Sequence, residues 1–164
     1  MQCVTQQLAH LRRTVPEFEA TVLDEIYSFA GAKAHRCYVF TAYCITDTGF
    51  VARYARAFEH CSIRSLILFL RDLPPAKMYF SDGAPMYGHV LTTKVLQEKG
   101  AVTNLVESFN AQVRQYTSTL RRRTRAYAKD LEGFAQRLAL TQVVHNWLVP
   151  RRQRRSPRTQ TPPT

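Results

Sequence analysis

Residues 17–30 read EFEATVLDEIYSFA, a run of β-branched, leucine and aromatic side chains that predicts a β-strand. Two acids, Asp24 and Glu25, stand in the middle of this apolar run. Burying a carboxylate costs free energy unless it is paired, hydrogen-bonded or bound to a metal ion. The run therefore predicts a core strand that carries acids with a structural or chemical role.

The segments after this strand predict a sheet with helices added late in the chain. After Gly31 an aromatic run predicts a second strand, and the turn signal TDTG leads into a third strand, so that the three form an antiparallel meander. This order favours an α/β or α+β sheet protein. The expected strands are 17–30, 37–45, 50–57, 77–80 and 94–98, and the expected helices are 61–70, 105–123 and 129–147.

Length and composition exclude several classes of protein. A chain of 164 residues with 45% hydrophobic residues predicts one folded domain rather than chain-wide disorder. No run of 18 apolar residues exists, and no secretory signal is visible, so we expect a cytoplasmic protein. Cys3, Cys37, Cys44 and Cys61 form no CxxC pair, which argues against a zinc ribbon; Cys37 and Cys44 are expected in the core.

The charge of the chain favours a polyanionic partner. Twenty-three Lys and Arg against twelve Asp and Glu give +11, which suggests nucleic acid first and an anionic membrane second. Residues 150–164 hold five arginines, four prolines and no acid, so this tail is expected to be disordered. Without its five charges the rest of the chain still carries +6. The tail is either a solvated end or a basic arm on DNA phosphates.

Three acids stand where a catalytic site could form. Asp24 lies mid-strand, Asp82 follows the KMYF strand just before Gly83, and Glu107 lies in the first turn of an expected helix. Such positions can converge at one edge of a sheet, and converged carboxylates are ligands for Mg²⁺ or Mn²⁺. Composition alone does not separate this from the common alternative, in which an Asp at a strand end simply caps a turn.

Three segments around these acids carry a family resemblance. Residues 23–33 read LDEIYSFAGAK, residues 78–87 read MYFSDGAPMY, and residues 106–115 read VESFNAQVRQ. In this order they resemble the acidic segments of insertion-sequence-one type bacterial transposases. Those segments are D-E-aromatic leading into G-x-K, (S/T)-D-G-x-P-x-Y after a strand, and E-x-x-N-x-x-x-R-Q. Twenty-four residues separate Asp82 from Glu107, a spacing similar to the family's, and the resemblance covers about residues 20–147.

The resemblance implies a fold and an activity. The fold is α/β, a ribonuclease-H-like mixed sheet with flanking helices, as in the retroviral-integrase group. The activity is metal-dependent DNA strand cleavage and strand transfer at transposon ends by a DDE-type transposase. Asp24, Asp82 and Glu107 would be the catalytic residues and the ligands of two Mg²⁺ ions, with Mn²⁺ as a substitute. Water would attack first, and the freed 3′-hydroxyl would then attack target DNA.

Helical spacing adds candidate DNA contacts. Asn110 and Arg114 lie three and seven residues after Glu107, on the same helix face, where they could bind a phosphate next to the acid. The alternatives are a plain exposed Glu, or a capping box formed by Asn104 and Glu107.

Other charged and aromatic residues have either a binding or a structural interpretation. Arg121, Arg122, Arg123 and Arg125 form a basic cluster that either tracks DNA phosphates or solvates a helix end. The histidines at 35, 89 and 145 lack ligand spacing and are expected to be structural. Tyr127 and Trp147 are expected in the core.

We expect three segments: an N-terminal extension at 1–16, the DDE transposase catalytic domain at 17–149, and the basic Pro/Arg-rich tail at 150–164. Members of the resembled family carry zinc-binding and helix-turn-helix segments ahead of this domain, so a separate end-recognition protein is a candidate partner. A homo-oligomer in a synaptic complex is expected because two DNA ends must be joined. The alternatives are a ribonuclease-H-like nuclease without strand transfer and a non-catalytic basic DNA-binding remnant.

Overall fold

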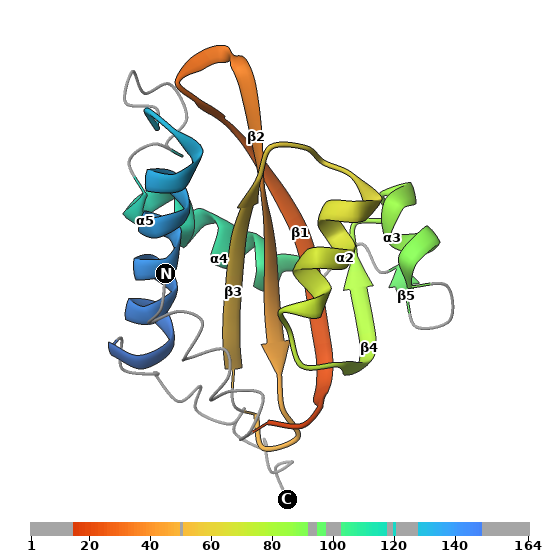
Figure 1. Cartoon of the computed structure of the whole chain (residues 1–164). Helices are drawn as coiled ribbons and strands as arrows, with labels where there is room; N and C mark the ends of the chain where they lie inside the picture. Colours follow the sequence, from red (N-terminus) through yellow and green to blue (C-terminus); the bar gives the residue numbers. More distant parts are fainter. Residues whose placement is uncertain are drawn as a thin grey trace, which may run out of the picture.

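The computed structural model describes residues 15–49, 51–91, 95–97, 103–117, 120 and 128–148, and in this part the chain forms a 5-stranded sheet (Figure 1). The strand order is β3-β2-β1-β4-β5. β1–β2 and β2–β3 are antiparallel, whereas β1–β4 and β4–β5 are parallel. The strands are β1 (Phe18–Ala30), β2 (Ala32–Ile45), β3 (Val51–Phe58), β4 (Ala76–Ser81) and β5 (Val95–Gln97).

Helices cover both faces of the sheet. α2 (Ile63–Arg71) and α3 (Pro85–Val90) lie on one face, and α4 (Thr103–Tyr116) and α5 (Leu131–Val143) lie on the other, as Figure 1 shows. A π-helical turn, η2 (Val144–Leu148), continues α5. A mixed sheet with helices on both faces confirms the expected α/β class and the ribonuclease-H-like arrangement.

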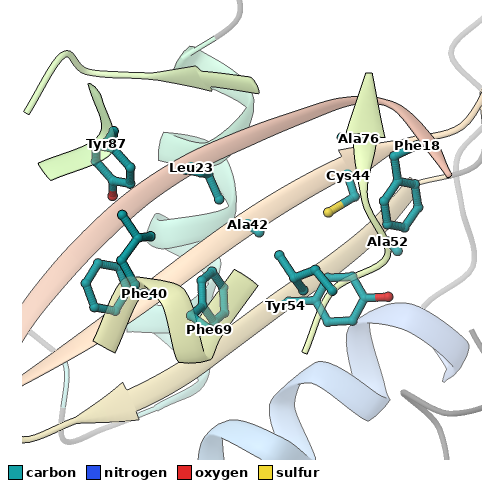
Figure 2. Packing of buried hydrophobic residues seen from close by; sticks show 12 residues of the cluster. Phe18, Leu23, Phe40, Ala42, Cys44, Ala52, Tyr54, Phe69, Ala76 and Tyr87 are labelled. Atoms are coloured by element: carbon teal, nitrogen blue, oxygen red, sulfur yellow. The ribbon is translucent and has the colours of Figure 1, made fainter. Parts of the chain in front are cut away.

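Successive side chains of β1 point alternately to the two faces of the sheet and pack in different clusters. Leu23 packs with Phe40 of β2 and Phe69 of α2 in one buried cluster, which Figure 2 shows together with Tyr87 of α3. Ile26 packs in a second cluster that includes residues of α4 and α5. Each large side chain buried in this way contributes roughly 1.5–3 kcal/mol. Because successive side chains of a strand point to opposite faces, the adjacent acids Asp24 and Glu25 must also face opposite layers.

Side-chain caps fix where two of the helices begin. Ser62 Oγ accepts a hydrogen bond from the backbone N–H of Ser65, and Asp130 Oδ1 accepts one from the N–H of Gly133. Both are N-caps, which satisfy backbone donors that have no partner within the helix. The expected helices at 61–70 and 129–147 therefore begin at Ile63 and Leu131 instead.

Four expectations need correction. β2 begins at Ala32 rather than at 37, because Gly31, with φ of 78°, turns the chain directly from β1 into β2. Residues 85–90 form α3, which the sequence analysis did not predict. α4 begins at Thr103, so Asn104 lies inside the helix and cannot cap it; the capping-box alternative for Glu107 is wrong. α4 ends at Tyr116, before the predicted end at 123.

Candidate active site

Asp24 lies half-buried at the centre of β1, on the face covered by α4. Its Oδ2 accepts a hydrogen bond from Asn110 Nδ2 of α4 at 2.5 Å, and its Oδ1 accepts one from the backbone N–H of Glu25 at 2.8 Å. Burial raises the pKa of Asp24, and the hydrogen bond from Glu25 opposes that rise. The two bonds hold the carboxylate in one orientation beneath α4.

Asp82 reaches the same level of the sheet from the neighbouring strand. β4 runs parallel to β1 with Val22 opposite Phe80, so two residues further along each strand the chain reaches Asp24 and Asp82. Neighbouring strands lie about 4.7–4.9 Å apart. The negative charge of Asp82 accordingly contributes to the raised pKa of Asp24.

Asp82 also shapes the turn that follows it. Its Oδ1 accepts a hydrogen bond from the backbone N–H of Ala84 at 3.1 Å, and Gly83 takes a φ of 85°, which favours glycine. The turn role that an Asp at a strand end commonly has is therefore present here. It does not exclude a second role, because the side chain of Asp82 is exposed beside Asp24.

α4 brings Glu107, Asn110 and Arg114 toward the same place. The helix is anchored by buried Val106, Phe109 and Val113, and Asn110 is only 2% exposed. Two further charges act on Asp24: that of Arg114 lowers its pKa, and that of Glu107 raises it. Asn110 contacts Asp24 directly, while Glu107 and Arg114 lie within electrostatic range of Asp24.

The acids share a neighbourhood without forming a ready-made coordination shell. Within the described part of the chain, no group of three His, Cys, Asp or Glu side chains is arranged to hold a metal ion. Beside Asp24, however, the buried Asn110 Oδ1 finds no hydrogen-bond donor among the described residues. A buried acceptor without a donor is uncommon in proteins and costs free energy. The site thus holds an oxygen that a ligand or water could satisfy.

A hydrogen bond behind the site links the segments that carry Asp24 and Asp82. Tyr87, which is 0% exposed in α3, donates from its hydroxyl to Glu25 Oε2 at 2.6 Å. Burial raises the pKa of Glu25, and it also raises the pKa of the Tyr87 hydroxyl. Both residues lie inside the motifs quoted above, but 62 positions separate them, and nothing in the sequence indicates that they pair.

Several predicted residues are placed away from this site or outside the described residues. His145 is 4% exposed and packs against Phe109 and Tyr116, as expected of a structural histidine. Cys37 and Cys44 are buried, and burial raises the pKa of their thiols to about 11 and about 12, which confirms them as core residues. Outside the described residues lie Arg121, Arg122, Arg123, Arg125, Tyr127, the side chain of Trp147 and the tail at 150–164.

The described helices include none long and apolar enough to cross a membrane.

In sequence comparisons, no curated protein matches the chain. A protein-family model described as IS1 transposase matches residues 19–144. This match extends from β1 into η2 and includes all three acids. The chain therefore belongs to the IS1 transposase family.

Proposed function

We propose that the chain cleaves DNA strands at the ends of an insertion sequence and transfers the freed 3′ ends to target DNA, in a metal-dependent reaction. The proposal depends above all on the parallel register of β1 and β4, which brings Asp24 and Asp82 to one level beneath α4. Family membership supports DNA as the substrate. The chain has 23 basic and 12 acidic residues, and this positive charge favours binding to a polyanion such as DNA.

The donor atoms suit hard divalent cations, Mg²⁺ with Mn²⁺ as a substitute. Asp24, Asp82 and Glu107 would provide carboxylate oxygens, and Asn110 Oδ1, which finds no donor among the described residues, would be a further oxygen ligand. Bound ions would supply Lewis acidity toward the attacking hydroxyl and the leaving oxygen. Asp82 and Glu107 are exposed, and turning Asp82 toward Asp24 would exchange its hydrogen bond from the N–H of Ala84 for a bound ion.

The neighbouring residues would hold the carboxylate and the DNA backbone in place. Asn110 keeps Asp24 oriented through the hydrogen bond to Oδ2. Arg114, whose charge already acts on Asp24, would pair with a phosphate next to the reacting one. We propose that Arg121, Arg122, Arg123 and Arg125 add further contacts to DNA phosphates. Joining two ends requires a homo-oligomeric synaptic complex, with end recognition by this chain or by a separate protein.

A strand-transfer assay tests the proposal. The substrates are labelled duplexes that carry the inverted repeats flanking the coding sequence, incubated with a supercoiled target plasmid and Mg²⁺. We expect joined products with the wild-type chain and none with Asp24→Asn or Asp82→Asn. Glu132→Gln is the matched control, because Glu132 is an exposed acid on α5. Cleavage without joining would favour the nuclease, and DNA binding without cleavage would favour the non-catalytic remnant; either would overturn the proposal.

A further inference from the structure

The hairpin formed by β1 and β2 extends beyond the rest of the sheet. The pairing of β1 with β4 ends at Val22, and the pairing of β2 with β3 begins at Tyr38. Tyr38 lies opposite Tyr27, so residues 28–30 and 32–37 form a two-stranded extension with these two tyrosines at its base, and its tip projects past the ends of β3 and β4 in Figure 1. On one face Ile26 and Cys37 pack into the cluster formed with α4 and α5.

The opposite face of this extension carries a row of aromatic rings. Tyr27 is 68% exposed, and its ring meets that of Phe29 edge-on, with the centroids 6.3 Å apart. Tyr38 lies directly opposite Tyr27, and the exposed Arg36 lies opposite Phe29. Residues opposite one another in a strand pair share a face. We call Tyr27, Phe29, Tyr38 and Arg36 the hairpin platform.

The charge around the platform indicates which partner fits it. Residues 26–46 contain Lys33, His35 and Arg36 but no acid. A second copy of the chain would place its own Arg36 and a net charge of +11 against the same charges, which is repulsive. Aromatic rings beside an arginine are the surface on which unpaired nucleic-acid bases stack, because every base has a π-face and every nucleotide has a phosphate.

We propose that the hairpin platform binds unpaired bases of a DNA strand, with Tyr27 stacking on a base and Arg36 contacting the backbone. Tyr27 follows Asp24 by three residues on the same strand, so its side chain points to the opposite face of the sheet from Asp24. The platform would thus hold unpaired DNA on the face of the sheet away from Asp24. DNA as the partner rests on the proposed function, but the binding itself needs neither the acids nor a metal ion.

Fluorescence anisotropy with labelled 20-nucleotide DNA, single-stranded or duplex, tests the platform in EDTA. We expect Tyr27→Ala to weaken single-strand binding by about five- to a hundredfold and to leave duplex binding within about twofold. Tyr27→Trp should retain the affinity, and Arg36→Ala should lower the salt dependence of binding by about one unit of slope. Tyr116→Ala is the matched control, since Tyr116 is a 59% exposed tyrosine on α4.

A second readout separates stacking from a general loss of structure. A DNA strand containing 2-aminopurine should lose fluorescence on binding the wild-type chain, but not on binding Tyr27→Ala. Unchanged single-strand affinity in Tyr27→Ala, or an equal loss in Tyr116→Ala, would overturn the proposal. In the Asp82→Asn/Glu107→Gln background, Tyr27→Ala should weaken single-strand binding by the same factor as it does in the wild-type chain. A chain that fails in strand transfer can therefore still support the platform proposal. A chain that fails to stack on bases can still support the catalytic proposal.

Discussion

At the scale of single residues, the acids and His145 show how burial sets the chemistry of a side chain. Asp24 and Glu25 are neighbours in the sequence, yet one accepts a hydrogen bond from Asn110 and the other from Tyr87, on opposite faces of the sheet. Asp24, Asp82 and Asn110 could be singled out from the sequence because they stand in recognisable motifs. The Glu25–Tyr87 pair could not, because a contact between residues 62 positions apart depends on how the elements pack.

His145 makes the stability of the protein depend on pH. Burial, and then the charge of Arg53, lower its pKa in the folded state below the ordinary value of 6.5. The unfolded chain therefore takes up a proton more readily, so stability is full above pH 6.5 and falls as the pH drops through 6.5. We expect His145→Leu to flatten this decline between pH 7.5 and 5.5, as measured by urea unfolding. His89→Gln, at an exposed histidine, should keep the wild-type decline; an equally flat curve there would contradict the assignment.

At the scale of the elements, the strands other than the start of β2 were predicted closely, whereas the end of α4 and the whole of α3 were not. β1 and β3 carry aromatic and β-branched residues between glycine or turn signals, which local propensity describes well. α3 has six residues and begins at Pro85, too short for helical periodicity to show. It is held instead by tertiary contacts: Tyr87 is buried against β1 and β2 in the cluster that Figure 2 shows.

The link between α3 and β1 predicts the effect of Tyr87→Phe. Removing the hydroxyl leaves the half-buried Glu25 carboxylate without its tyrosine donor, and a hydrogen bond to a charged group contributes about 1.5–3 kcal/mol. We expect a loss of that size in the free energy of unfolding, and a strongly reduced effect when Glu25 is replaced by Ala in the same chain. Tyr27→Phe, at an exposed tyrosine of β1, should change stability by less than about 0.5 kcal/mol. A fully stable Tyr87→Phe would show that the bond does not tie α3 to β1.

At the scale of the whole molecule, the mixed sheet explains how separate segments of the chain come close together at Asp24. Antiparallel pairing builds the β1–β2 hairpin and its platform, while parallel pairing of β1 with β4 aligns Asp24 with Asp82. α4 then covers Asp24 on one face of the sheet. On the other face, Tyr87 of α3 binds Glu25, which links the segments that carry Asp24 and Asp82. The sequence predicted the fold class and the acids, since both have local signatures. The hairpin platform emerges only once the lengths of the paired strands are compared.

The central claim is that Asp24, Asp82 and Glu107 form one cation site, and calorimetric titration with Mn²⁺ tests it most directly. We predict that the wild-type chain binds Mn²⁺ and that Asp82→Asn/Glu107→Gln weakens binding at least about tenfold, a range typical of altered metal sites. Glu132→Gln should bind as the wild type does, and thermal melting should show all three chains folded. Equal binding by all three chains, or no binding by the wild type, would contradict the claim.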